Sequence, residues 1–110
     1  MYYVSKRVEV AGAHSLILDY KSPCCNLHGH NWIITVHCKS ETLNDNGMVV
    51  DFSKIKTTVN QLDHKDANQV VPGNPTAENI AKWLCDQILY CYKVEVQESE
   101  GNVAVYEKVV

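Results

Sequence analysis

Three histidines of this sequence have the type and spacing of metal ligands. His28 and His30 flank a single glycine, and alternate side chains of an extended strand point to the same face, so the two imidazoles share a face. That face continues as an apolar series: Trp32, Ile34, Val36 and Cys38. Imidazole-rich sites suit zinc, and three protein ligands with one open position are typical of catalytic zinc centres. The pair therefore predicts a zinc centre at the edge of an apolar core.

A third imidazole, His14, closes an alternating series near the amino terminus. Residues 2–13 predict a strand whose even-numbered side chains share a face with His14. If this strand pairs antiparallel with a strand over residues 29–40, the loop between them returns the chain so that His14 lies beside His28 and His30. The three histidines are therefore the predicted ligands of Zn²⁺.

Length and composition limit the class of protein. The 110 residues suffice for one domain, over residues 1–110, and the small core of such a chain makes a homo-oligomer an expectation. The net charge is -3 and no cluster of basic residues occurs, so no nucleic-acid partner is expected. No apolar stretch of membrane-spanning length and no leader pattern are found, so we expect a cytoplasmic protein with no membrane partner. The five cysteines are odd in number and lack Cys-x-x-Cys spacing, which disfavours a disulfide framework.

Periodicity and turn residues predict the elements that position the histidines. Strands are expected over four segments: residues 2–13, 29–40, 92–99 and 103–109. Helices are expected from a cap at Asp51 to residue 62 and from a cap at Thr76 to residue 89, because both segments carry apolar residues at helical spacing. The expected fold class is α+β, with a four-stranded antiparallel sheet, two helices on one face and the order ββααββ.

Three further polar positions could serve a site, and each has a structural alternative. Glu98 shares the apolar face of its strand, so it lies either at a solvated strand end or where a ligand donates hydrogen bonds to it. Asp63 and His64 follow the first expected helix, where His64 would either complement the helix dipole or form a proton-transfer pair with Asp63. The residues alone leave these alternatives open.

Taken in order, these positions resemble the signature residues of the 6-pyruvoyltetrahydropterin synthase superfamily. The matching segments span nearly the whole chain: Ala13-His14, Cys24-x-x-x-His28-Gly29-His30, Leu62-Asp63-His64, Asn74-Pro75-Thr76-x-Glu78 and Glu98. The spacing from Cys24 to His28 is similar to that of the 6-carboxy-5,6,7,8-tetrahydropterin synthases of the queuosine (7-deazapurine) pathway.

The resemblance implies a fold and a reaction. The fold would be the T-fold, or tunnelling fold, assembled as a homohexamer that is a dimer of trimers. The reaction would be that of a zinc-dependent lyase, which converts 7,8-dihydroneopterin triphosphate to 6-carboxy-5,6,7,8-tetrahydropterin, acetaldehyde and triphosphate.

The resemblance also implies a role for each matching residue. The three histidines would hold Zn²⁺. Cys24 would act as general base, and Asp63 with His64 would form a second proton-transfer unit. Glu98 would accept hydrogen bonds from the amino and ring N–H groups of the pterin, and Thr76 would bind the pterin edge.

Two alternatives keep parts of this interpretation. A 6-pyruvoyltetrahydropterin synthase, or another enzyme acting on a dihydropterin, would share the fold and form a different product. A non-catalytic zinc-binding module would instead close the site with Cys24 or Cys25 as a fourth ligand, and the other polar positions would then be replaceable.

Overall fold

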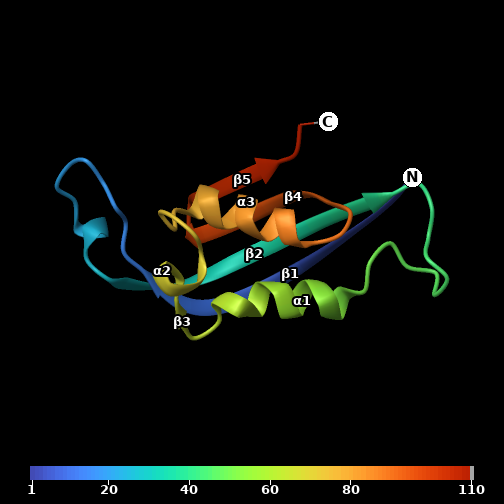
Figure 1. Cartoon of the computed structure of the whole chain (residues 1–110), viewed down its shortest axis with the longest axis horizontal. Helices are drawn as coiled ribbons and strands as arrows, with labels where there is room; N and C mark the ends of the chain where they lie inside the picture. The colour runs from blue at the N-terminus through green and yellow to red at the C-terminus, as the bar shows by residue number, and fades with distance from the viewer. Residues whose placement is uncertain (110) are drawn as a thin grey trace.

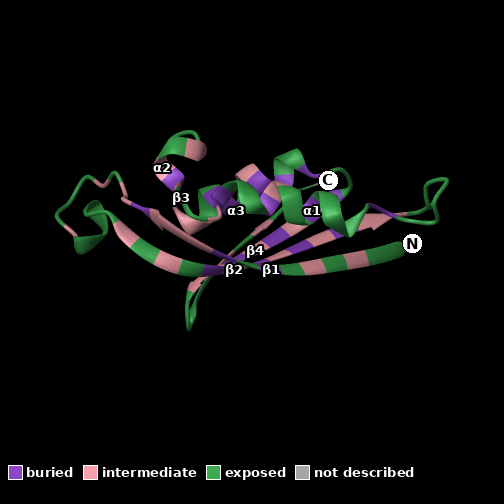
Figure 2. Ribbon diagram, turned by 90° about the horizontal axis from the view of Figure 1, so that it is seen from below, coloured by how far each residue is buried: buried purple, intermediate pink, exposed green. Residues whose placement is uncertain are grey.

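A five-stranded sheet spans the molecule, and the helices cover one of its faces. The computed structural model describes residues 1–109. Within them the strands lie in the order β3-β1-β2-β4-β5: β1 Tyr2–His14, β2 His28–Ser40, β3 Lys65–Asp66, β4 Cys91–Ser99 and β5 Asn102–Glu107. The helices are α1 Phe52–Val59, α2 Ala67–Val70 and α3 Ala77–Gln87. Figures 1 and 2 show α1 and α3 on the same face of the sheet, so the predicted α+β class is confirmed.

The pairing of β1 with β2 sets the positions of the histidines. The two strands are antiparallel over the 13 residues of each, and His14 lies opposite His28. Gly12 lies opposite His30 in the same register. The three imidazoles therefore gather at the end of the hairpin from which the long β1–β2 loop projects (Figure 1). The antiparallel pairing predicted from the alternating pattern is confirmed.

The prediction of a four-stranded antiparallel sheet in the order ββααββ is wrong in strand number and direction. β3 is a fifth strand of two residues that pairs parallel to the end of β1, so the sheet is mixed. Backbone contacts of Ala11 hold this segment in place: its N–H donates to Asp63 Oδ1 at 3.0 Å, and its carbonyl accepts from the His64 N–H at 2.6 Å. A strand of two residues has no alternating pattern, so periodicity could not reveal it.

Both main helices begin at their predicted caps and end earlier than predicted. The side chain of Asp51 accepts from the N–H two residues onward at 2.8 Å, and that of Thr76 accepts from the N–H three residues onward at 3.1 Å. α1 gives way to a 3-10 turn at residues 60–62, and α3 ends at Gln87 because the next residue is already extended. No helix within residues 1–109 has the length and apolarity needed to cross a membrane. The cytoplasmic location stays a prediction.

One apolar core lies between the sheet and the helices. Its largest fully buried hydrophobic side chains come from both layers and the turn after α1: Val10, Trp32, Ile34, Val36, Ile55, Val59, Leu62, Ile80, Leu84, Val94 and Val96. Figure 2 shows this burial on the surfaces that the sheet and the helices turn toward each other. Apolar burial stabilises a fold by about 25 cal/mol per Å², so this layer is a main source of the stability of the fold.

Candidate metal centre and active site

The three predicted ligands meet at one place. His14 ends β1, and His28 and His30 begin β2. Their ring centroids are 4.6 Å apart for His14 and His28, 4.8 Å for His28 and His30, and 5.0 Å for His14 and His30. One nitrogen of each ring and a carboxylate oxygen of Glu98 all lie within 4.8 Å of one another. His14 is fully buried, and the other three residues are half-buried.

Two backbone carbonyls orient the imidazoles. His14 Nδ1 lies 2.7 Å from the carbonyl oxygen of Pro75, and His28 Nδ1 lies 2.7 Å from that of Asn26. A carbonyl oxygen can only accept, so Nδ1 carries the proton in both rings and donates it. Each ring is left with the lone pair of Nε2, which is the form that binds a metal ion.

Glu98, near the end of β4, completes the cluster. Its Oε1 is 3.0 Å from His14 Nε2 and 2.9 Å from His30 Nε2. Since the proton of His14 is on Nδ1, its Nε2 and the carboxylate are both acceptors, and two acceptors this close require a proton or a cation between them. The contact with His30 lacks hydrogen-bond geometry, and within residues 1–109 the buried Nε2 of His30 has no hydrogen-bond partner. The three imidazoles fit Zn²⁺, for which histidine is an ordinary ligand, and the carboxylate adds negative charge beside them.

Burial favours the neutral form of His30. Desolvation is the largest cause of a lowered pKa for this imidazole, and the nearby charges of His14 and His28 lower it further. The charge of Glu98 and its contact with the ring act in the opposite direction. Because a histidine must be deprotonated to bind a metal ion, the lowered pKa keeps His30 available as a ligand near neutral pH.

Gly12 and Trp32 pack closely against each other beside the His14 ring. Trp32 is fully buried, and its ring centroid lies 5.2 Å from that of His14. A Cβ on Gly12 would lie 2.7 Å from Trp32 Cζ3 and 3.0 Å from the carbonyl oxygen of Leu62. Glycine therefore allows the end of β1, which carries His14, to pack directly on the indole ring.

His30 and Glu98 line an open hollow on the surface beside the other two histidines. Its volume is about 540 Å³, and residues of β1, β2 and β4 line it: Ala11, Gly12, Gly29, His30, Asn31, Glu98 and Ser99. Pockets that bind small molecules commonly have volumes of roughly 300 to 1,000 Å³. The centre thus combines candidate metal ligands with space for a substrate beside them.

The two cysteines of the β1–β2 loop lie outside the histidine cluster. Cys24 and Cys25 belong to a 3-10 turn, Pro23–Cys25, and both are exposed. The hydroxyl oxygen of Ser22 accepts from the Cys24 N–H at 3.2 Å, and the Cys24 carbonyl accepts from the Leu16 N–H at 2.7 Å. Neither thiol belongs to the group of potential metal ligands within residues 1–109. The chain therefore holds the backbone of Cys24, and the arrangement disfavours a site closed by a cysteine.

The Asp63–His64 pair is anchored to β1. Asp63 Oδ1 accepts from the Ala11 N–H, and Asp63 Oδ2 lies 3.6 Å from His64 Nε2. His64 has a left-handed φ of 57°, and 82% of its side chain is exposed. The hydroxyl of Thr76 serves as the cap of α3. The structure thus brings Glu98 to the three histidines, whereas the His64 ring faces solvent.

Two features of this centre are not predicted by the sequence pattern. One is the place of Glu98, which the resemblance assigns to the pterin and the structure puts directly beside the imidazoles. A usable signal is parity, because Glu98 shares the face of Val96, and β4 pairs with the strand that carries His30. The other feature is the pair of orienting carbonyls, from Asn26 and Pro75, which no side-chain pattern marks.

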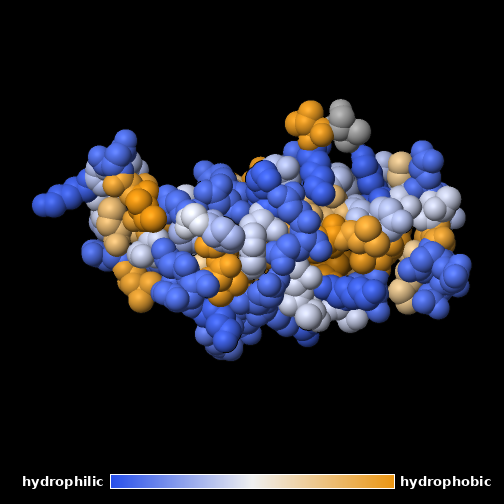
Figure 3. All heavy atoms as spheres, in the orientation of Figure 1, coloured by the Kyte–Doolittle hydropathy of each residue, from blue (hydrophilic) through white to orange (hydrophobic). Residues whose placement is uncertain are grey.

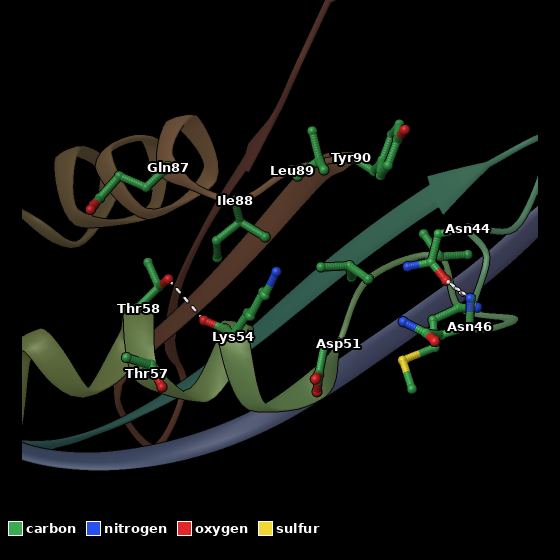
Figure 4. A pocket seen from close by; sticks show the side chains of 13 residues that line it. Asn44, Asn46, Asp51, Lys54, Thr57, Thr58, Gln87, Ile88, Leu89 and Tyr90 are labelled. Atoms are coloured by element: carbon green, nitrogen blue, oxygen red, sulfur yellow. Dashed lines mark hydrogen bonds between the residues drawn. The ribbon is translucent and has the colours of Figure 1, made fainter.

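A second cleft lies away from the histidines, between α1 and the connection from α3 to β4. Its volume is about 600 Å³, and Asn44, Lys54, Ile88 and Tyr90 are among its lining residues. Figure 4 shows the Lys54 side chain extending from α1 toward Ile88, with Asn44 at one end of the gap. This cleft is better enclosed than the hollow at the histidines, but imidazole and thiol groups are absent from its lining. The candidate chemistry is therefore assigned to the histidine centre.

Comparisons with known proteins show the family and the fold that this chain shares. The family model described as 6-pyruvoyl tetrahydropterin synthase matches residues 3–109. A 6-pyruvoyl tetrahydrobiopterin synthase of Dictyostelium discoideum is 31% identical over 97 residues, which cover 76% of this chain and 72% of that protein. A 6-carboxy-5,6,7,8-tetrahydropterin synthase of Synechocystis sp. is 33% identical over 121 residues, covering 96% and 93%. The solved 6-pyruvoyl tetrahydropterin synthase of Caenorhabditis elegans shares the fold, with a TM-score of 0.76 and 23% identity over 98% of this chain and 96% of that one.

Proposed function

Because this chain belongs to the 6-pyruvoyl tetrahydropterin synthase family, we propose that residues 1–110 form a single-domain, zinc-dependent lyase acting on 7,8-dihydroneopterin triphosphate. The proposed products are 6-carboxy-5,6,7,8-tetrahydropterin, acetaldehyde and triphosphate, made for queuosine biosynthesis. The observation that carries the proposal is the convergence of His14, His28 and His30 beside a hollow of ligand size. The spacing from Cys24 to His28 and the similarity to the Synechocystis synthase favour the 6-carboxy product.

The proposed zinc ligands are His14, His28 and His30. Bound zinc would supply Lewis-acid stabilisation of the negative charge that develops on the substrate side chain. The chain's own contribution is orientation, because the carbonyl oxygens of Pro75 and Asn26 hold two of the rings with Nε2 free. Ligands that are already oriented lose less conformational freedom when the metal and the substrate bind.

Cys24 is the proposed general base that removes a carbon-bound proton from the substrate. Its thiol is exposed, as a group that must reach a substrate needs to be. Its backbone is held by Ser22 and Leu16, which supports a fixed position for the thiol. Cys25 shares the same turn, and its thiol donates weakly to the Tyr20 carbonyl at 3.9 Å, so it is a neighbour with no assigned role.

Asp63 and His64 are the proposed second proton-transfer unit. The Ala11 N–H donates to one oxygen of Asp63, and the other oxygen faces His64 Nε2. The carboxylate can therefore orient the imidazole and stabilise its protonated form. The exposure of His64 suits a site that is completed where chains meet.

Glu98 and Thr76 are the proposed contacts to the pterin. Glu98 Oε1 faces the imidazoles, and the proposed role of the carboxylate is to accept hydrogen bonds from the amino and ring N–H groups of the pterin. Thr76 stands next to Pro75, whose carbonyl holds the His14 ring, so the start of α3 is close to the centre. Both residues lie near the histidine centre, which supports their proposed contact with a pterin bound beside it.

The proposed assembly is a homohexamer of two stacked trimers whose sheets close into barrels. Most of β1 has a strand partner on one side only, since β3 pairs with Gly12 and Ala13 alone, and β5 is the opposite edge strand. Exposed strand edges favour pairing with another chain. Apolar side chains also gather on the β1–β2 loop, where Ile17 and Leu27 are 73% and 63% exposed (Figure 3). Burial of this loop against another copy would cover them.

The proposal is tested by identifying the product that the zinc-loaded protein forms from 7,8-dihydroneopterin triphosphate. The expected product has the mass of 6-carboxy-5,6,7,8-tetrahydropterin, and it should be accompanied by acetaldehyde. In the Cys24→Ala variant the rate should fall by about 100- to 10,000-fold at unchanged zinc content, which is the usual contribution of a general base. Cys25→Ala is the matched control and should retain activity. Loss of zinc together with activity in Cys24→Ala would contradict the assigned role.

The second candidate is a 6-pyruvoyltetrahydropterin synthase, favoured by the similarity to the Dictyostelium synthase. It would act on the same substrate with the same zinc ligands and release triphosphate. Its product retains the side-chain carbons, so no acetaldehyde would form. The two products differ in mass, and the same experiment therefore separates the candidates.

A further inference from the structure

Two asparagine side chains hold the segment that leads into the loop carrying Cys24. The Ser15 N–H donates to Asn68 Oδ1 at 2.8 Å, and the Ser15 carbonyl accepts from Asn68 Nδ2 at 2.9 Å. Ile17 makes the same pair of bonds with Asn74, also at 2.8 and 2.9 Å. Each amide thus supplies the donor and the acceptor that a neighbouring β-strand would supply.

The residue between the two held residues reaches Cys24 directly. In an extended chain the N–H groups of successive residues point to opposite edges. The backbone groups of Ser15 and Ile17 therefore face the two asparagines, whereas the N–H of Leu16, between them, points to the opposite side of the segment. There it donates to the Cys24 carbonyl oxygen at 2.7 Å. The backbone of Cys24 is one hydrogen bond away from the segment that the two amides hold.

The same part of the chain orients a candidate metal ligand. Asn74 precedes Pro75, whose carbonyl oxygen accepts from His14 Nδ1 at 2.7 Å. Asn74 is itself held by Asn79, whose Nδ2 donates to the Asn74 carbonyl at 2.8 Å from within α3. Asn68 lies in α2, which follows directly from the short strand β3. The loop with the thiol is therefore attached to the elements that position the His14 ring.

We propose that Asn68 and Asn74 are positioning residues, whose amides fix the Cys24 turn relative to the histidine centre. The inference rests on the proposed role of Cys24 as general base. A displacement of about 1 Å in a reacting group can lower a rate by about 100-fold, so a loop of this length needs such attachments. The two amides provide them through backbone contacts and add no side chain to the substrate hollow.

The first test measures the loop itself and needs no turnover. Zinc-loaded Asn68→Ala and Asn74→Ala are compared in a Cys25→Ser background, where Cys24 is the exposed thiol. Backbone hydrogen exchange at residues 15–17 should accelerate by about tenfold or more, because protection follows local opening. The rate of Cys24 alkylation by iodoacetamide should change by about threefold or more, because reactivity follows the surroundings of the thiol. Zinc content should stay constant.

Asn44→Ala is the matched control for both measurements. Asn44 also holds a loop through its amide oxygen, which accepts from the Asn46 N–H at 2.9 Å and the Met48 N–H at 3.1 Å. That loop lies at the opposite end of the sheet from the Cys24 turn (Figure 1). Loss of the Asn44 amide should leave the hydrogen exchange of residues 15–17 and the alkylation of Cys24 unchanged. Unchanged rates in Asn68→Ala and Asn74→Ala, or changes explained by lost zinc, would overturn the proposal.

The second test separates positioning from general stability. In Asn68→Ala and Asn74→Ala, kcat should fall by about tenfold or more while KM stays within about threefold, because the chemistry is affected and binding is not. Asn74→Asp should behave like Asn74→Ala, since it keeps the acceptor for the Ile17 N–H and sets a carboxylate oxygen against the Ile17 carbonyl. A fall in kcat that tracks only the loss of Tm would overturn the proposal. If the unmodified protein does not act on 7,8-dihydroneopterin triphosphate, the proposed function fails, and exchange and alkylation still decide the positioning role.

Discussion

His14 Nδ1 and the carbonyl oxygen of Pro75 lie 2.7 Å apart, although 61 positions separate the two residues in the chain. The contact joins the end of β1 to the residues that begin α3. It also determines which nitrogen of the buried ring is free to bind a metal ion. The sheet and the helical layer therefore meet at a candidate ligand, and the stability of the fold and the geometry of the centre are linked there.

Replacing His14 by alanine should remove zinc and lower stability. The Pro75 carbonyl would lose its donor, and an unpaired buried acceptor costs about 1–3 kcal/mol in the free energy of unfolding. Zinc content and urea unfolding of the metal-free protein measure the two effects. His37→Ala is the control, because His37 Nε2 contacts Glu95 at 2.6 Å on the face of the sheet away from the helices, and it should keep its zinc. Full zinc content in His14→Ala would contradict the assignment of this ligand.

Replacing Gly12 by alanine should destabilise the protein and weaken zinc binding. The new Cβ would lie 2.7 Å from the Trp32 ring and 3.0 Å from the Leu62 carbonyl oxygen. Forced contacts of this kind cost about 1–3 kcal/mol, and relief by a shift of β1 would move His14. Gly29→Ala is the matched control, since its Cβ would meet the Gly12 carbonyl oxygen at an ordinary 3.5 Å. Equal unfolding free energies for the two variants, measured in urea, would contradict the packing account.

Thiol titration of the folded protein should detect two reactive cysteines. Cys24 and Cys25 are exposed, whereas Cys38, Cys85 and Cys91 are buried. Burial is the largest cause that raises the pKa of the Cys85 thiol to about 12, so its thiolate form is scarce near neutral pH. A disulfide reagent used at about pH 8 should therefore react quickly with two thiols in the native state and with all five in denaturant. Rapid reaction of more than two native thiols would show that the core opens more readily than its packing implies.

Lowering the pH should destabilise the metal-free protein through His30. Burial lowers the pKa of this imidazole in the folded state below its ordinary value of 6.5. The unfolded chain therefore takes up the proton at higher pH than the folded chain. The free energy of unfolding should fall as the pH drops below about 6.5, by at most about 1.4 kcal/mol per pH unit for this proton. Urea midpoints measured across this range should show a flatter profile for His30→Asn, and identical profiles would contradict the account.

The convergence of the three histidines and the pairing of the two long strands could be predicted from alternation. The even-numbered face of residues 2–13 and the series that begins at His28 define two half-buried strands, and an antiparallel pairing of those strands brings His14 to His28 and His30. Both helix caps, Asp51 and Thr76, follow from their residue types. These features are local or periodic, so they leave a trace in the order of residues.

The remaining features depend on long-range contacts that no repeating pattern in the sequence marks. β3 is a strand of two residues, and its attachment to β1 relies on the side chain of Asp63 and the backbone of His64. Asn68 and Asn74 reach the β1–β2 loop across 53 and 57 positions of sequence. Hydrogen bonds from a side chain to a distant backbone segment arise only in the tertiary fold. The sequence therefore shows that the asparagines are present, but it does not show which backbone groups they bind.

The most direct test of the account is the X-ray absorption spectrum of the zinc-loaded protein, which reports the ligand atoms of the metal. Three imidazoles and no cysteine at the metal predict a first shell of nitrogen and oxygen at about 2.0–2.2 Å. The spectrum should be the same in Cys24→Ala, because the proposed role of Cys24 is at the substrate and its thiol lies outside the group of potential metal ligands. A zinc–sulfur distance of about 2.3 Å that disappears in Cys24→Ala would instead show a site closed by the thiol, and it would contradict the proposal of a catalytic centre.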